Sequence, residues 1–389
     1  MPSLLRLSLL IVTGFIIHSI TAYGQKIQDS TANNISLQVA NFSYFRNYEY
    51  YNDLQKGYTL FGHTLTPVLS FNNHKSPLAL EAGAFIQQDF GNTSLQRVRP
   101  AIALTARKIY YVKSIDITRP IFKKEWSFRM GTLYNQDYHL LPEVLYNRDQ
   151  LVFNPLEYGI QFRYRNPFIE TDQWLHWQRM IYNNSTGNEH FQVGISAISR
   201  TTSDSSKNHI TIPIHCLIQH SGGQIGQPDT SDSGGTTINL NSGLYFNKYF
   251  NSSCIQSMRF GFQYALSNTN QQQLPDVPQI GRGIEFSATI TFLKRFYGTI
   301  SYWQARDFYA PYGRFITQSR SSAFTDTYTY IPERQLIFVK LNYVYQLGNF
   351  LKINLEAEPY YDMQASLFEY AYHLTIHYQF LSRLYRQKN

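Results

Sequence analysis

Apolar and polar side chains alternate along most of the chain. In the stretch EYAYHLTIHYQF, residues 369–380, Tyr, Leu, Ile and Phe fill every second position, and Ala, His, Thr and Gln lie between them. This period of two places one kind of side chain on each face of a β-strand. Past Gln25, no window shows a convincing helical period. The pattern therefore predicts an all-β protein.

Sixteen segments of the chain show this alternation. Most of them are 12 to 16 residues long, whereas strands of soluble sheets average about 5–6 residues. A tilted strand that crosses a membrane needs about 9–11 residues within the lipid, so these lengths favour membrane-spanning strands. In chain order the predicted strands are 35–46, 57–71, 77–89, 96–112, 123–134, 151–166, 170–182, 188–200, 207–220, 236–248, 255–268, 280–293, 295–306, 334–347, 350–362 and 366–380.

The gaps between these segments give a second test. The four longest gaps, 135–150, 221–235, 269–279 and 307–333, all follow odd-numbered segments. Most gaps after even-numbered segments are short, with 113–122 as an exception. Outer-membrane barrels alternate in this way between short periplasmic turns and longer extracellular loops.

Together these patterns predict a single antiparallel transmembrane β-barrel of about 16 strands, within a range of roughly 14–18, with short periplasmic turns and long extracellular loops. In such a barrel lipid covers the apolar face, and closure pairs every strand edge, as the hydrocarbon layer demands. The rival interpretation is an exported soluble sandwich or propeller. Its strands would be shorter, and its gap lengths would not alternate.

The N-terminus indicates export. An apolar run from Leu7 to Ile17 follows Arg6 and precedes Ala-Tyr-Gly at 22–24, which is typical of a secretory signal peptide. The alternative is a buried N-terminal strand or helix; the run is too short for a spanning helix, which needs about 20 apolar residues. We therefore expect a signal peptide at 1–24, an outer-membrane barrel at 25–380 and a basic periplasmic tail at 381–389.

Composition agrees with a membrane barrel. Aromatic residues make up 16% of the chain and charged residues only 15%, against a usual charged share of about 25%. The net charge of +8 comes with no basic run or recognition motif, which argues against nucleic-acid binding. The expected partners are outer-membrane lipid, lipopolysaccharide and, during insertion, the barrel assembly machinery; the oligomeric state stays open.

The parity of the strands predicts which charged and polar side chains line the lumen. Both signs of charge occur, so no strong ion selectivity is expected, and sixteen strands leave an aqueous channel unless loops fill it. The lumen-lining candidates are Glu81, Arg129, Arg163, His215, Arg259, Glu285, Lys340, Lys352, Glu356, Glu358, His373 and His377.

Two long gaps are candidates for closing the mouth. Segment 307–333 is long and aromatic, and such loops are usually functional; we favour a constriction over a platform that stacks sugars. Its constriction-loop candidates are Arg314, Arg320, Asp326 and Glu333. In segment 135–150, Leu140 and Val144, and Leu141 and Leu145, have helical spacing after a Pro142 suited to a first turn, which predicts a short helix capping the mouth.

Several stretches carry a family resemblance. NYEYYNDLQKGYTLFGHTLTP (47–67), NPLEYGIQFRY (154–164), DQWLHWQ (172–178) and HSGGQI (220–225) resemble porin-like, largely uncharacterised outer-membrane β-barrel proteins of Bacteroidota-type Gram-negative bacteria. The resemblance implies the barrel fold and the outer membrane, and it transfers no catalytic residues. One departure is the end of the chain: such barrels often stop at an aromatic residue, whereas here Phe380 is followed by LSRLYRQKN.

No catalytic, cofactor or metal site is expected from the motifs. His373 and His377 share a face but lie about 13 Å apart along a strand, whereas each ligand of a Zn²⁺ ion sits about 2 Å from it. Outer-membrane lipases and lipid A deacylases resemble one another in a barrel-wall His with a Ser two positions on. The one such motif here, His74-Lys75-Ser76, falls in a predicted periplasmic turn, which does not preorganise a nucleophile. We therefore expect a protein that is not an enzyme.

The expected function is a porin-like channel for passive or weakly selective passage of small polar solutes. The alternative is a non-conducting outer-membrane barrel that handles surface glycan or capsule material through its aromatic extracellular loops. The polar inward face favours the first, in which segment 307–333 shapes the constriction; in the second, aromatic loops such as this segment would bind the surface material.

Overall fold

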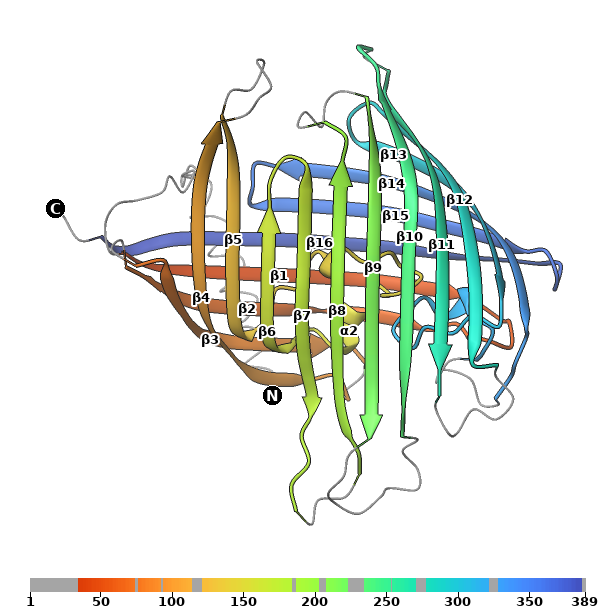
Figure 1. The fold of residues 1–389 in the computed structure, drawn as a ribbon, viewed down its shortest axis with the longest axis horizontal. Coiled ribbons are helices and arrows are strands. Elements are labelled where there is room, and N and C mark those ends of the chain that lie inside the picture. The colour runs from red at the N-terminus through yellow and green to blue at the C-terminus, as the bar shows by residue number, and fades with distance from the viewer. Residues whose placement is uncertain are drawn as a thin grey trace.

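The computed structural model describes residues 34–73, 76–91, 94–113, 121–183, 187–202, 208–222, 234–252, 254–270, 278–321 and 328–386. Their strands form one closed antiparallel barrel in chain order, with β16 pairing back onto β1 (Figure 1). The strands are β1 (Asn34–Glu49), β2 (Thr59–Asn72), β3 (Leu78–Asp89), β4 (Arg97–Lys113), β5 (Ile121–Thr132), β6 (Tyr158–Arg165), β7 (Ile169–Arg179), β8 (Glu189–Arg200), β9 (His209–Gly222), β10 (Gly235–Tyr249), β11 (Ile255–Thr269), β12 (Ile280–Phe292), β13 (Phe296–Arg306), β14 (Glu333–Leu347), β15 (Leu351–Asp362) and β16 (Leu367–Arg386).

The expected fold class is confirmed: the described residues form a sixteen-stranded antiparallel barrel. Most predicted strand boundaries agree with the observed ones within three residues. Two differ more. The segment predicted as a strand from residue 151 contains a helical turn, α2 (Gln150–Phe153), and β6 begins only at Tyr158. The barrel also does not end at Phe380, because β16 continues to Arg386, which pairs with Asn34 at the start of β1. The predicted signal peptide lies outside the described residues.

The two faces of the barrel differ in polarity. On β11, for example, Phe260 is 53% exposed and Phe262 39%, whereas Gln263 on the other face is 6% exposed. The outer apolar positions form the lipid-facing surface that a membrane barrel requires, and the closed ladder leaves no strand edge unpaired. This chain is thus an outer-membrane β-barrel. None of the helices that the structure describes is long and apolar enough to cross a membrane.

Two long connections enter the barrel from the same, extracellular end. We call residues 133–157, between β5 and β6, the plug loop, and residues 307–332, between β13 and β14, the second loop. The plug loop contains α2 and the short 3₁₀ helix η2 (Tyr138–Leu140), and the second loop contains η3 (Phe315–Thr317). Figure 1 shows α2 behind β7 and β8, within the barrel.

The helix predicted around Pro142 is reduced to a single turn. The Pro142 carbonyl accepts hydrogen bonds from the backbone N–H groups of Leu145 and Tyr146, at 2.9 and 3.0 Å, and the chain then leaves the helical path. Leu145 and Tyr146 are fully buried in an apolar cluster that both loops share with the barrel wall. Packing inside the barrel therefore decides the conformation of this segment, because its helical spacing extends over little more than one turn.

Candidate functional site: a barrel lumen crossed by two loops

The plug loop contacts the barrel wall on several sides. Asp149 pairs with Arg46 of β1 and accepts a hydrogen bond from Tyr48 at 2.7 Å. The Val152 carbonyl accepts one from Gln87 of β3 at 3.1 Å, and the Phe153 carbonyl accepts one from Arg97 of β4 at 3.0 Å. On the other side of β1, Glu143 pairs with Lys340 of β14 at 2.9 Å, and Arg148 pairs with Glu356 of β15 at 3.0 Å. Strand β15 lies across the barrel from β7, whose Asp172 contacts His139 of the plug loop. The loop therefore spans the lumen.

The second loop extends this barrier along the rest of the wall. Trp303 of β13 donates to the Thr317 carbonyl at 2.9 Å, Arg334 of β14 donates to the Ile316 carbonyl at 3.0 Å, and Asn239 of β10 donates to the Tyr309 carbonyl at 2.8 Å. The two loops also bond to each other: the Arg314 N–H donates to the Glu143 carbonyl at 2.9 Å. They act as one layer across the barrel.

A buried imidazole attaches the plug loop to β7. His139 is 0% exposed; its Nε2 lies 2.6 Å from a Glu157 oxygen and its Nδ1 lies 2.9 Å from an Asp172 oxygen. Its ring stacks on Trp174 at a centroid separation of 3.9 Å. Burial alone would lower the pKa of His139, but the neighbouring carboxylates outweigh it and raise the pKa to about 9. His139 is therefore a cation at neutral pH and has no lone pair with which to act as a base.

The backbone around His139 is strained. Tyr138, His139 and Leu140 have φ values of 55°, 53° and 62°, a left-handed region that costs a non-glycine residue roughly 1–2 kcal/mol. Three such residues in a row persist only where tertiary contacts hold them. The contacts of His139 with Glu157 and Asp172 are what holds them here.

A layer of charged side chains lies where the two loops meet the wall. We call Glu143, Arg148, Arg314, Lys340, Glu356 and Glu358 the charge layer. Lys340 lies 2.9 Å from Glu143 and 3.1 Å from Glu358, and Arg314 pairs with Glu358. Burial would raise the pKa of Glu143, but Arg148, Lys340 and Arg314 hold it well below its usual range. The three carboxylates and three cations balance one another.

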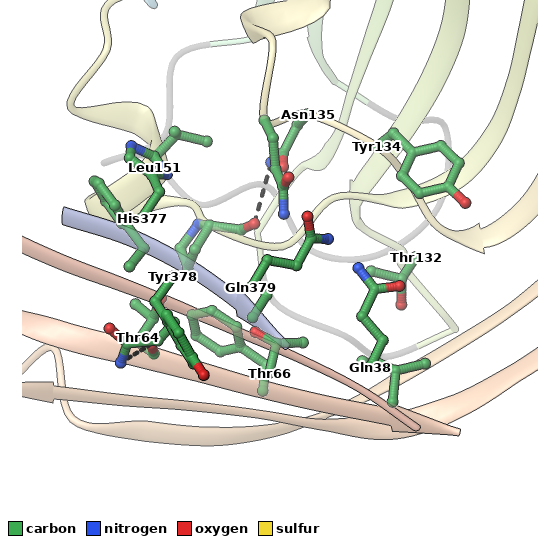
Figure 2. A pocket seen from close by; sticks show the side chains of 18 of the residues that line it. Gln38, Thr64, Thr66, Thr132, Tyr134, Asn135, Leu151, His377, Tyr378 and Gln379 are labelled. Carbon is green, nitrogen blue, oxygen red and sulfur yellow. Dashed lines mark hydrogen bonds between the residues drawn. The ribbon is translucent and has the colours of Figure 1, made fainter. Parts of the chain in front are cut away.

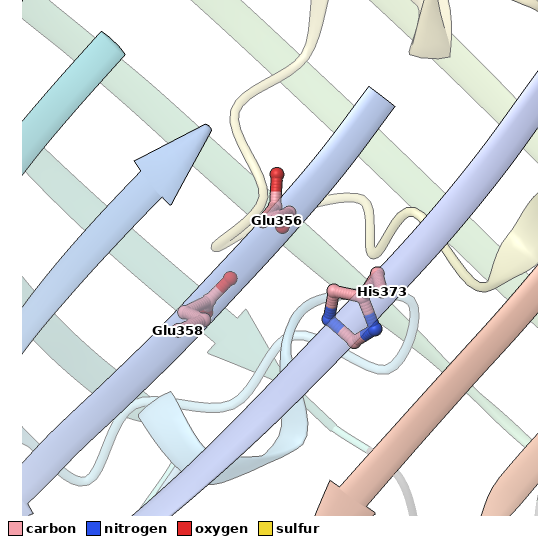
Figure 3. A group of neighbouring side chains, drawn as sticks. All are labelled: Glu356, Glu358 and His373. Carbon is pink, nitrogen blue, oxygen red and sulfur yellow. The ribbon is translucent and has the colours of Figure 1, made fainter. Parts of the chain in front are cut away.

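Two carboxylates of the charge layer and His373 form a group of neighbouring potential metal ligands (Figure 3). One ligand atom each from Glu356, Glu358 and His373 lies within 4.8 Å of the others. Both carboxylates, however, are already paired with cations: Glu356 with Arg148 and Glu358 with Arg314. A divalent ion would have to displace these positive groups from buried pairs, which is costly. The donor set therefore does not fit a resident metal.

The structure brings some predicted lumen residues together. Lys340, Glu356, Glu358 and His373 meet Arg314 of the second loop at or beside the charge layer. Arg163 pairs with Asp172 at 2.7 Å, so it joins the His139 site. Glu81 and Arg129 pair with each other at 2.8 Å.

Other predicted residues lie apart. Arg259 stacks on Tyr245 with its guanidinium 3.8 Å from the ring centroid, Glu285 accepts a hydrogen bond from Gln263 at 3.1 Å, and His377 packs on Phe42. Lys352 is exposed and pairs in register with His377, and His215 lies on the β8–β10 wall. In the second loop, Arg320 stacks on Tyr309, and Glu333, the first residue of β14, lies 3.9 Å from Arg306. Asp326 is outside the described residues.

The sequence analysis missed the residues that build the plug. Arg46 and Asp172 lie on predicted strands at inward positions, so parity alone identifies them as lumen residues. His139, Glu143 and Asp149 belong to a segment treated as a mouth cap or a gap, and no periodic signal marks their partners. Their roles appear only when the loop is seen inside the barrel.

Beneath the plug loop, on the periplasmic side, lies a cavity of about 250 Å³ (Figure 2). Polar side chains from β1, β2 and β16 line it, among them Gln38, Thr66 and Gln379, and Asn135 and Leu151 of the plug loop form its other side. At the charge layer the corresponding cavity is only about 20 Å³, close to the space that one water needs. The free space at the charge layer is therefore much smaller than the cavity beneath the plug loop.

Among the residues that the structure describes, two outward imidazoles lie beside a hydroxyl group on the neighbouring strand. On β9, His220 occupies an outward position at the extracellular end, and its Nδ1 lies 2.9 Å from Thr236 Oγ1 on β10. On β1, Ser43 lies directly opposite His63 of β2, and both occupy outward positions. Ser43 itself donates to Asn41 at 3.1 Å. Only the His220–Thr236 pair is in hydrogen-bond contact.

Comparison with solved structures returns outer-membrane proteins. Outer membrane protein OprD from Pseudomonas aeruginosa is 10% identical, with a TM-score of 0.47, over 90% of this chain and 95% of that one. OmpT of Vibrio cholerae with loop L8 deleted is also 10% identical, with a TM-score of 0.49, over 90% of this chain and 100% of that one. No curated protein matches the sequence.

A family model gives the more informative comparison. The lipid A 3'-O-deacylase-type model matches residues 27–386, which include every described residue. This corrects the expectation that the chain is not an enzyme, because the family is described by a hydrolytic activity. The H-x-S argument behind that expectation was too narrow: it tested one spacing along a single strand, whereas a barrel also brings His and hydroxyl groups together across strands. The chain belongs to the lipid A 3'-O-deacylase-type family of outer-membrane β-barrel proteins.

Proposed function

We propose that this barrel hydrolyses an acyl ester of lipid A in the outer leaflet of the outer membrane. The observation that carries the proposal is the family match along the whole barrel, residues 27–386. In the reaction a nucleophile attacks the ester carbonyl, the bond between the acyl carbon and the sugar oxygen breaks, and the sugar oxygen takes a proton. Water supplies the hydroxyl group of the released fatty acid and the hydrogen of the free sugar hydroxyl.

The His220–Thr236 pair is our candidate for the chemical site. Ester hydrolysis needs a base within hydrogen-bond reach of the attacking hydroxyl or water, and His220 Nδ1 lies 2.9 Å from Thr236 Oγ1. The pair occupies outward positions at the extracellular ends of β9 and β10, next to Phe191, whose ring centroid is 5.0 Å from that of His220. A lipid in the outer leaflet reaches such a position directly. His139 does not fit the role, because it is fully buried and cationic.

Mass spectrometry of lipid A tests the proposal. Expression of the full chain in a Gram-negative host should yield lipid A that lacks one ester-linked acyl chain. His220→Gln and Thr236→Val should abolish this loss, and His63→Gln, at the other outward imidazole, serves as the matched control. If only the control variant loses activity, the site lies at Ser43 and His63. Unchanged lipid A with a folded wild-type barrel in the membrane would contradict the hydrolase itself.

A second candidate is gated passage of small polar solutes, in line with the porin-like fold. The cavity of about 250 Å³ beneath the plug loop favours it, since this cavity lies in the path of a solute that crosses the lumen. Passage would require the plug loop to leave the charge layer. Conductance of a variant with a shortened plug loop tests this candidate, because the docked loops would keep the full chain silent whether or not the lumen can serve as a gated passage.

A further inference from the structure

The inner wall of β8–β11 carries polar side chains with unused hydrogen-bonding capacity. We call the following residues the amide wall: Gln192, Ser196, His215, Gln219, Asn239, Asn241 and Gln263. Each is more than nine-tenths buried, and each has at least one side-chain nitrogen or oxygen without a hydrogen-bond partner among the described residues. A buried polar group left unpaired costs about 1–3 kcal/mol, so such a concentration on one wall requires an explanation.

The strand register arranges these residues in rows. Ser196, His215 and Asn241 lie side by side on β8, β9 and β10, and Gln192 lies beside Gln219 four residues nearer the extracellular end. Adjacent strands are about 4.8 Å apart and four residues along a strand span about 13 Å. The wall therefore presents a grid of donors and acceptors about the size of a disaccharide.

Segments of both loops lie against this wall. The helix η2, which contains Tyr138, contacts β8. Tyr138 and Tyr312 pack against the apolar cluster that includes Trp174 and Leu217, and Leu217 lies on β9 between His215 and Gln219. Asn239 donates to the backbone carbonyl of Tyr309 at 2.8 Å, so the second loop also touches the wall.

The chemistry of these groups indicates the ligand class. When His215 is neutral, none of the seven residues carries a formal charge. Hydrogen-bond donors and acceptors occur together: Gln192 and Asn241 each have both a side-chain nitrogen and a side-chain oxygen without a partner among the described residues. Phosphates and carboxylates are bound by Arg and Lys, which the amide wall lacks. Sugar hydroxyls both donate and accept, and their apolar ring faces suit tyrosines.

We propose that the amide wall, together with the loop tyrosines, is a binding site for a neutral saccharide. In the present conformation the loops cover the wall, so the sugar reaches it only when the plug loop swings away from the charge layer and the His139 site. The proposal stands on the unpaired atoms of the wall and does not depend on the proposed ester hydrolysis.

Titration calorimetry of the full chain in detergent tests this site. The probes are the neutral disaccharides chitobiose, cellobiose and maltose, with glucose 6-phosphate as the charged comparison. The variants are Gln192→Leu and Asn241→Leu, and Gln379→Leu, at an exposed lumen amide on the opposite wall, is the control for loss of an amide outside the amide wall. We expect at least one neutral disaccharide to bind, at least tenfold weaker binding by both wall variants, and unchanged binding by the control.

Thermal melting distinguishes a ligand-binding role of these amides from a structural role, because the two roles predict opposite changes in melting temperature. Replacing an unpaired buried amide with an apolar group of similar size is neutral or stabilising, so the melting temperatures of Gln192→Leu and Asn241→Leu should equal or exceed that of the wild type. A fall in melting temperature for both would show that the amides pair within the fold, and it would overturn the proposal. So would binding of glucose 6-phosphate alone, absence of binding by every neutral disaccharide, or equal binding by all variants.

Discussion

At the scale of single residues, His139 has a role that its surroundings create. As a lone histidine in a gap between strands it carries no signal, whereas its partner Asp172 is an inward residue of a predicted strand. The ion pair forms because the plug loop enters the barrel and brings the imidazole to β7. Parity along a strand thus predicts which strand residues face the lumen, but not which loop residue meets them.

Removing the charge of His139 should release the plug loop. His139→Gln leaves Glu157 and Asp172 buried without their cation, and loss of one partner of a buried pair costs about 3–5 kcal/mol. Hydrogen exchange of residues 133–157 should report a lower free energy of local opening by about this amount. Arg165→Gln is the control: the Arg165 side chain is 62% exposed in its pair with Glu170, so a change below about 1 kcal/mol is expected. Equal protection in the two variants would contradict the role given to His139.

The same site predicts a pH dependence. The pKa of His139 is raised from 6.5 to about 9 in the folded state, so its stabilisation of the docked loop is complete below pH 6.5 and is lost as the pH rises through about 9. The pKa of Glu157 is lowered from 4.5: burial raises it, but the charge of His139 outweighs burial. Its contribution is present above pH 4.5 and falls as acid protonates it. Protease resistance of the plug loop should therefore be highest between these limits, and His139→Gln should flatten the alkaline side; a flat wild-type profile would contradict this.

At the scale of elements, the sequence predicts the strands but not the conformations of the loops. An apolar face exposed to lipid imposes the same two-residue period on every strand, whatever the partner. In the sequence, Leu151 and Val152 resemble the start of a strand because both residues are apolar. In the structure both are buried, but in a helical turn inside the barrel. A strand and a helical turn would both bury these two side chains, so hydrophobicity alone does not distinguish the two conformations.

Lys340 joins the two loops to the wall, and its removal should loosen both. It lies within 3.8 Å of Glu143, Glu356 and Glu358, so Lys340→Gln leaves three buried carboxylates with less compensation. We expect cleavage of the plug loop by added protease to accelerate at least tenfold. Lys352→Gln, a lumen lysine outside the charge layer, is the matched control and should leave the rate unchanged. The same rate in both variants would show that the charge layer does not hold the loop.

Shortening the plug loop should open the lumen. Replacing residues 137–153 with a short Gly–Ser linker removes the contacts to β1, β3, β4, β14 and β15 but leaves every strand intact. Correct folding is checked by the heat-dependent gel mobility of the barrel. The variant should then conduct in planar bilayers, with steps larger than any seen for the full chain. A folded variant that stays silent would mean that the second loop alone closes the lumen.

At the scale of the whole molecule, a porin-like wall surrounds an interior that the extracellular loops fill. The strand count and the placement of long loops after odd-numbered strands followed from periodicity, because lipid and barrel closure constrain the entire chain in the same way. The contents of the lumen did not follow, because they depend on contacts between distant residues such as Arg148 and Glu356. Activity at the outer surface and mouth of the barrel fits this arrangement better than free diffusion through it.

The most direct test of this account is a single-channel recording of the full-length mature chain in a planar bilayer at neutral pH. With both loops docked at the charge layer, we predict no steady conductance from a preparation whose barrel is shown to be folded. Stable, stepwise conductance from that preparation would contradict the account, because it would mean that the two loops do not close the lumen.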